Sequence, residues 1–300
     1  MRNIGTSTLK ILAFLGVWAL LTSGAVMATV WLGGESFYTE TRYRVGLEVV
    51  LTIVVLAALM FTARFVDKRS LRTIGFAPGH LPELLLGAIV GAAIFAIPLA
   101  VLAMMGAAHF APDLSGFSAQ ALGIGLLVCF FNVATQEILV RSYMFQELWE
   151  KYGAWIATIV TTLFFVALHT AALLQGAQGL IAGANILLAS LLLSLAYVRT
   201  GALWLPIGIH LGWNGLQGPV LGINVTGLDL GFGHWSVFSF TGDALLTGGE
   251  MGVEGGLVGL IGPAVGIAVV ALAAKQQPKP KFAPEVKYHR RAQVDALPTQ

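Results

Sequence analysis

Apolar runs of about 20 residues recur along this sequence, and they constrain the fold more than any other feature. A helix of that length crosses the roughly 30 Å hydrocarbon core of a bilayer. The composition agrees, because 57% of the 300 residues are hydrophobic and 11% are charged, whereas about 25% are charged in a typical soluble domain. The sequence therefore predicts an all-α, polytopic membrane protein. We expect about eight transmembrane helices, near residues 11–32, 45–66, 84–107, 118–149, 154–174, 179–198, 203–222 and 254–274. The first run is longer than the 7–15 apolar residues of a signal peptide, so we expect it to be a retained span.

Basic residues predict the orientation of these helices, since Lys and Arg gather on the cytoplasmic side of membrane proteins. With eight spans and a cytoplasmic N-terminus, the C-terminus is cytoplasmic too, and the outer segments hold only Arg42 and Arg44. The remaining Lys and Arg, apart from Arg141 inside a span, fall on the inner side: Arg2, Lys10, Arg64, Lys68, Arg69, Arg72, Lys151, Arg199, Lys275, Lys279, Lys281, Lys287, Arg290 and Arg291. This asymmetry supports the predicted number of spans.

The domain organisation is simple. Residues 1–275 are predicted to form one transmembrane domain, and residues 276–300 a basic, disordered cytoplasmic tail that can touch anionic lipid. The outer loop 223–253 contains acidic residues and no Lys or Arg, and its aromatic stretch 234–240 lies either in the membrane interface or over a cavity as a lid. The net charge of +2 is too small to indicate a nucleic-acid partner.

Three of the apolar segments contain polar or ionisable residues spaced four apart, which places them on one face of a helix. The segments read Gln136-Glu137-Ile138-Leu139-Val140-Arg141, Phe165-Val166-Ala167-Leu168-His169 and His210-Leu211-Gly212-Trp213-Asn214. A charged group at bilayer depth costs about 2.5–3.5 kcal/mol or more, so it persists where it pairs, lines a wet cavity or does chemistry. Taken singly, each segment also has a purely structural explanation: an ion pair between Glu137 and Arg141, two buried histidines, and an interhelical hydrogen bond from Asn214.

The depth of these residues favours one shared site. At a rise of 1.5 Å per residue, Glu137 lies ~18 Å from Trp149, His169 ~24 Å from Gly153 and His210 ~15 Å from Thr200. A carboxylate and two imidazoles are thus predicted in one layer of the membrane. A single convergent polar site explains them more simply than three separate structural roles.

In this order the segments resemble the signature of the CPBP family, which runs Glu-Glu-xxx-Arg, Phe-xxx-His and His-xxx-Asn on successive membrane helices. These are intramembrane proteases related to the CAAX prenyl endopeptidases and to bacteriocin-processing and immunity proteins. The segment Ser70-Leu71-Arg72-Thr73-Ile74-Gly75-Phe76 also resembles the start of the family core, so the resemblance covers about residues 66–222. It implies that the first glutamate and His169 activate a water, that Glu137 pairs with Arg141, and that His210 and Asn214 stabilise an oxyanion.

This chain departs from the family at one position, since Gln136 replaces the first glutamate. A neutral amide has no useful basicity, and Glu137 points about 100° away from residue 136 on a helix. Three interpretations follow. The protein is an active endopeptidase in which Glu137 or His169 is the base; or it is a non-catalytic scaffold or immunity protein; or Gln136 is a deliberate change made to trap substrate.

The sequence also predicts the remaining properties of the site. The candidate catalytic residues are Gln136, Glu137, Arg141, His169, His210 and Asn214. We favour a metal-free attack of water; if zinc is bound instead, its ligands are His169, His210 and Glu137. The expected partners are membrane lipid and a peptide or protein substrate that is membrane-anchored or prenylated. The expected location is the cytoplasmic (inner) membrane of a bacterium, as a multi-pass protein. A transporter is a weaker alternative, which a flux assay in liposomes would distinguish.

Overall fold

The computed structural model describes residues 4–34, 41–77, 82–228 and 235–273. Its principal helices and strands, in chain order, are α1 (Ile4–Gly33), α3 (Thr41–Phe61), α4 (Pro82–Met104), β1 (Ala108–Asp113), α5 (Ala119–Arg141), α6 (Tyr143–Tyr152), α7 (Ala154–Leu168), α8 (Thr170–Leu173), α9 (Gly176–Thr200), α10 (Trp204–Gly215), β2 (Ser236–Phe240), α11 (Ala244–Thr247) and α12 (Ile261–Ala273). Two π-helical turns continue α3 and α10, at Thr62–Val66 and Leu216–Val220. Short 3-10 turns lie at Leu71–Ile74, Gly249–Met251, Val253–Gly255 and Leu257–Leu260.

The predicted helical membrane architecture is present, and its finer count stays a prediction. Within the described residues, five helices are long and apolar enough to cross a membrane: Ser7–Gly33, Tyr43–Val66, Pro82–Met104, Ala119–Tyr152 and Gly176–Thr200. The other three expected spans fall on shorter or interrupted helices. The expected tail, 276–300, and His234 of the aromatic stretch lie outside the described residues.

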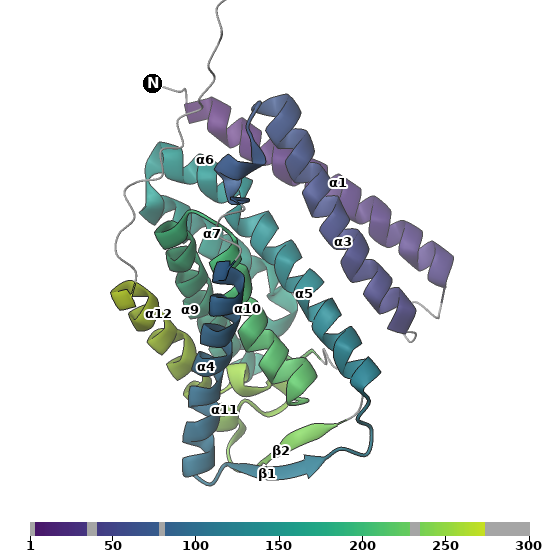
Figure 1. Cartoon of the computed structure of the whole chain (residues 1–300), viewed down its shortest axis with the longest axis vertical. Coiled ribbons are helices and arrows are strands. Elements are labelled where there is room, and N and C mark those ends of the chain that lie inside the picture. The colour runs from purple at the N-terminus through teal and green to yellow at the C-terminus, as the bar shows by residue number, and fades with distance from the viewer. Residues whose placement is uncertain (1–3, 35–40, 78–81, 229–234, 274–300) are drawn as a thin grey trace, which may run out of the picture.

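The expectation of a purely helical fold is wrong in one respect. Strands β1 and β2 pair antiparallel, with Ala108 opposite Phe240 and Phe110 opposite Phe238, and lie at one end of the bundle (Figure 1). The rings of Phe110 and Phe238 pack edge to face across this pair. The described part of the aromatic outer stretch is therefore a strand, because alternating aromatic and small side chains suit a half-buried ribbon.

A charged cluster joins the opposite end of the fold. Asp67 accepts a hydrogen bond from Lys10 and pairs with Arg69 at 2.6 Å, and Arg69 also pairs with Glu147 and Glu150. These contacts tie α1 and the segment after α3 to α6. Figure 1 shows α1 and α3 side by side, and α3 packs against α5 at the edge of the bundle that contains α4, α7, α9, α10 and α12.

The fourth expected span, residues 118–149, is broken into two helices. Helix α5 ends at Arg141, and Ser142 leaves the helical region with φ −87° and ψ −104° before α6 begins. The Ser142 hydroxyl donates to the Ile138 carbonyl, so the break remains hydrogen-bonded inside the protein. The C-terminal end of α5 is thus held in place by hydrogen bonds, and its last two turns contain Glu137 and Arg141.

Helix α10 packs against α4 with almost no side chain between the backbones. A Cβ atom at Gly91 would lie 2.0 Å from the Ile209 carbonyl oxygen, and one at Gly212 would lie 2.0 Å from the Ala88 carbonyl oxygen. A Cβ atom at Gly87 would lie 2.5 Å from the Leu205 carbonyl oxygen, and one at Gly208 would lie 2.3 Å from the Leu84 carbonyl oxygen. Small residues at such an interface let membrane helices approach closely. The predicted small-residue spacing from Gly87 to Gly91 therefore serves packing, and it fixes the helix that carries His210 and Asn214.

Candidate active site

The centre of the polar site is Glu137, whose side chain has no exposed surface. Its Oε1 accepts a hydrogen bond from Arg141 Nη1 at 2.8 Å and another from His210 Nδ1 at 2.9 Å. Arg141 is also fully buried, and its Nη2 donates to Ser190 Oγ of α9 at 2.8 Å. The spacing of four residues puts Glu137 and Arg141 on one helical face, as expected, and the pair is linked to α9 and α10 as well.

Phe165 packs the three motifs together. Arg141 Cζ lies 4.8 Å from the centroid of the Phe165 ring, the His169 ring centroid lies 4.8 Å from it, and the His210 ring centroid 6.0 Å. A guanidinium over an aromatic face is attracted to its π-electrons. The structure thus brings together residues of α5, α7 and α10 that lie far apart in the sequence.

A break in α7 sets the proton position on His169. The helix ends at Leu168, and the His169 backbone N–H donates to Val166 instead of to Phe165, four residues back. The Phe165 carbonyl oxygen accepts from His169 Nδ1 at 2.8 Å instead. Because a carbonyl oxygen only accepts, Nδ1 carries the proton, and Nε2 of the neutral ring has a free lone pair. Its Nε2 atom is therefore the ring nitrogen that can accept a proton.

His210 also carries its proton on Nδ1, and this limits what its Nε2 atom can do. Its Nδ1–H donates to the Glu137 carboxylate, so Nε2 of the neutral ring accepts hydrogen bonds and donates only when the ring is an imidazolium. The expected role of His210 as a donor to an oxyanion thus requires the protonated ring. In that state the imidazolium of His210 shares the Glu137 carboxylate with Arg141.

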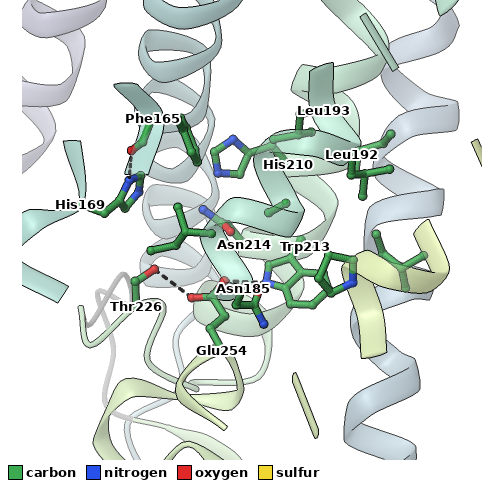
Figure 2. Close-up of a pocket in the computed structure, with 15 residues that line it drawn as sticks. Phe165, His169, Asn185, Leu192, Leu193, His210, Trp213, Asn214, Thr226 and Glu254 are labelled. Atoms are coloured by element: carbon green, nitrogen blue, oxygen red, sulfur yellow. Dashed lines mark hydrogen bonds between the residues drawn. The ribbon is translucent and has the colours of Figure 1, made fainter. Parts of the chain in front are cut away.

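Both histidines and Asn214 line one pocket, shown in Figure 2. The lining residues are Ile94, Phe165, His169, Asn185, Ile186, Ala189, Leu192, Leu193, Ile209, His210, Trp213, Asn214, Thr226, Glu254 and Pro263. Three predicted site residues, Gln136, Glu137 and Arg141, are not among them. Glu137 and Arg141 lie behind the wall of the pocket, where Arg141 bonds to Glu137 and Glu137 bonds to His210.

Three polar residues of this wall, Asn185, Thr226 and Glu254, were not singled out from the sequence. Asn185 of α9 is 2% exposed, and its Nδ2 has no hydrogen-bond partner among the described residues. Glu254 is 7% exposed and belongs to the 3-10 turn Val253–Gly255. The sequence offered one signal for each of two residues: Asn185 is a polar residue within an apolar helix, and Glu254 is an acid just before an apolar run.

Gln136 faces away from this lining, toward α3. Its Nε2 donates to Asn132 Oδ1 at 2.8 Å, and Asn132 Nδ2 donates to the Glu48 carboxylate at 3.3 Å. Since an ionised carboxylate only accepts, the Asn132 amide must turn its NH₂ group to Glu48 and its oxygen to residue 136. This chain of hydrogen bonds needs a donor at position 136. A glutamine supplies that donor, and an ionised glutamate does not.

Few side chains in this site could act as ligands of a metal ion. No group of three or more His, Cys, Asp or Glu side chains close enough to hold a metal ion occurs in the described ranges. Of the three ligands expected for zinc, Glu137 already accepts from Arg141 through Oε1, and His210 already uses Nδ1 for Glu137. Glu137 Oε2 is buried without a hydrogen-bond partner among the described residues, and the hydrogen bonds of His169 and His210 use their Nδ1 atoms, so one carboxylate oxygen and two Nε2 atoms stay open to a ligand.

The fold and the pocket define an integral membrane protein in which a buried Glu137–Arg141 pair holds His210 in the wall of a cavity that His169, Asn214 and Glu254 also line. Residues 118–216 match the sequence model of a family described as Rce1-like, type II CAAX prenyl endopeptidase Rce1-like. The match runs from the start of α5 to the end of α10 and contains all three motifs, and it confirms the resemblance to the CPBP family of CAAX proteases. No curated protein and no solved structure matches the chain.

Proposed function

We propose that the protein is an intramembrane endopeptidase that hydrolyses a peptide bond of a membrane-associated or lipidated substrate. The observation that carries this proposal is the proton position on His169, whose Nδ1–H is bonded to Phe165 and whose Nε2 is left as a base. His169 lines the same pocket as Asn214, whose amide can donate a hydrogen bond. A base and a donor beside one cavity are what acyl transfer to water requires.

The reaction then proceeds in two steps. His169 Nε2 takes a proton from a water as the water oxygen bonds to the scissile carbonyl carbon, and the negative charge develops on the carbonyl oxygen. The Asn214 amide and the imidazolium of His210 donate to this oxygen. The protonated His169 then gives its proton to the amide nitrogen as the C–N bond breaks, which restores the base.

The substrate class follows from the family and the surroundings of the pocket. The matched family is described as prenyl endopeptidases, and the apolar helices place the site within a membrane protein. We therefore propose a membrane-anchored or prenylated peptide as substrate, membrane lipid as the surrounding partner, and the cytoplasmic membrane of a bacterium as the location.

A non-catalytic scaffold or immunity protein is the second candidate, and Gln136 is the observation that favours it. Glutamine cannot act as a base, and its side chain faces Asn132 instead of the pocket wall. Such a protein would bind membrane peptides without cleaving them.

The test incubates the purified protein in liposomes with a library of membrane-associated peptides, farnesylated CAAX peptides included, and reads products by mass spectrometry. His169→Ala is the matched blank. We expect the parent protein to cleave peptides and the His169→Ala variant to cleave none. If both proteins bind peptides and neither cleaves them, the non-catalytic scaffold is favoured. A parallel incubation with a zinc chelator should leave cleavage unchanged, and chelator-sensitive cleavage restored by added zinc would assign the metal.

A further inference from the structure

Glu254 is a carboxylate of the pocket that lies outside the region matched to the family. It belongs to the 3-10 turn Val253–Gly255, whereas the family match ends at residue 216. Two side chains donate to it: Trp213 Nε1 donates to Oε1 at 2.7 Å, and Thr226 Oγ1 donates to Oε2 at 2.8 Å (Figure 2). The backbone N–H of Thr226 donates to the carboxylate as well. The side chain therefore has one fixed orientation in the wall.

This carboxylate keeps a free acceptor site. The two carboxylate oxygens together accept about four hydrogen bonds, and the indole, the hydroxyl and the backbone N–H of Thr226 supply three. No Lys or Arg pairs with Glu254 among the described residues, and His210 is the charged or titratable side chain that interacts with it electrostatically. Burying a carboxylate is costly, and such groups are kept where they pair or do chemistry. Glu254 has the hydrogen bonds of an ionised acid and lacks a permanent counterion.

The other acids near the site cannot reach a substrate in the same way. Glu137 lies behind the pocket, where its Oε1 accepts from both Arg141 and His210. Glu48 is bonded to Asn132, on the side of α5 that faces α3. Glu254 is thus the carboxylate in the lining of the pocket that also contains His169 and Asn214.

We propose that Glu254 is the carboxylate that orients the attacking water for His169, in place of the glutamate that Gln136 lacks. One O–H of the water donates to the Glu254 carboxylate and the other to His169 Nε2. His169 takes the proton as the oxygen bonds to the carbonyl carbon, and Glu254 stays ionised and stabilises the imidazolium. The proton then leaves with the amine when the C–N bond breaks. This inference rests on the proposed peptidase function.

The test measures kcat and KM of Glu254→Gln with the farnesylated CAAX peptide or, if that is not cut, with the library peptide cleaved fastest. We expect kcat to fall by about 100-fold or more with KM unchanged, as for a lost group in general acid–base catalysis. Glu250→Gln is the matched control, because Glu250 is an exposed glutamate four residues earlier in the same loop. It should keep the parent's kcat.

Thr226→Val separates catalysis from anchoring of the loop. This change removes one hydrogen bond to Glu254 but leaves its charge in place, so the loss in kcat should stay below about tenfold. Equal losses in Thr226→Val and Glu254→Gln would make Glu254 an anchor of the loop and overturn the proposal. Labelling of the buried Cys129 thiol reports whether each variant is folded.

If Glu254→Gln unfolds, Glu254→Asp carries the same test. It keeps the charge but withdraws the carboxylate by one methylene, and a misplacement of about 1 Å can cost 100-fold in rate. A fall in kcat at constant KM supports the proposal, and parent-level kcat overturns it. If the parent cleaves the peptide and Glu254→Gln is equally active, this inference fails and the proposed peptidase function stands. A parent that cleaves no peptide overturns both proposals.

Discussion

Replacing Gly212 by alanine tests whether the contact of α10 with α4 sets the geometry of the site. The new Cβ atom would lie 2.0 Å from the Ala88 carbonyl oxygen, whereas ordinary contact begins at 3.4 Å. The backbones must therefore separate locally by the difference, about 1.4 Å, because neither group is the end of a flexible side chain. His210 and Asn214 lie two residues before and after this position and move with it.

The expected result has two parts. Overpacking costs about 1–3 kcal/mol of stability, and a displacement of about 1 Å in the site lowers kcat by roughly 100-fold. Gly215→Ala is the matched control on the same helix, since its Cβ would meet Leu126 Cδ2 at an ordinary 3.6 Å. Exchange of a helical glycine for alanine at such a position gains about 0.5–1 kcal/mol.

Thermal unfolding in detergent can be followed with a thiol-reactive dye, because the chain has a single cysteine, Cys129, and it is buried. Gly212→Ala should expose this thiol at a lower temperature than the parent, and Gly215→Ala at an equal or higher one. If the two variants unfold and cleave alike, the close helix contact does not position the site and the argument is refuted.

Two further predictions concern the polar groups. Gln136→Glu should lower the free energy of unfolding by about 1–3 kcal/mol, because the Asn132 oxygen then faces a second acceptor. Adding Glu48→Gln should recover this loss of stability. A single variant as stable as the parent would contradict the proposed order of hydrogen bonds. Asn214→Ala should lower kcat about 100–1,000-fold with little change in KM, as removal of an oxyanion donor does, and equal effects on kcat and KM would remove this role.

The sequence alone was sufficient to predict the elements that carry local signals. Apolar runs predicted the membrane helices, and the spacing of Glu137 and Arg141 predicted their contact. Depth counting predicted that His210 would meet the motif of α5, and the bond from His210 Nδ1 to Glu137 agrees with it. These inferences work because helical periodicity and helical rise are fixed by the backbone.

The features that depend on tertiary context were not predictable in this way. The break at Ser142 has no Gly or Pro to announce it. The outward position of Gln136 depends on Asn132 and on Glu48 of another helix. Glu254 reaches the pocket through an irregular loop, and no period or motif connects such a residue to His169. Contacts made by loops and by partners far along the chain are set by packing, which a local pattern does not encode.

The most direct test of the central claim is the origin of the oxygen in the cleavage product. The protein in liposomes cleaves its peptide in water enriched in oxygen-18, and mass spectrometry measures the label in the new carboxyl terminus. Water attack assisted by His169 predicts one labelled oxygen per product from the parent and no product from His169→Ala. Unlabelled products, equal cleavage by His169→Ala, or no cleavage by the parent would contradict the account.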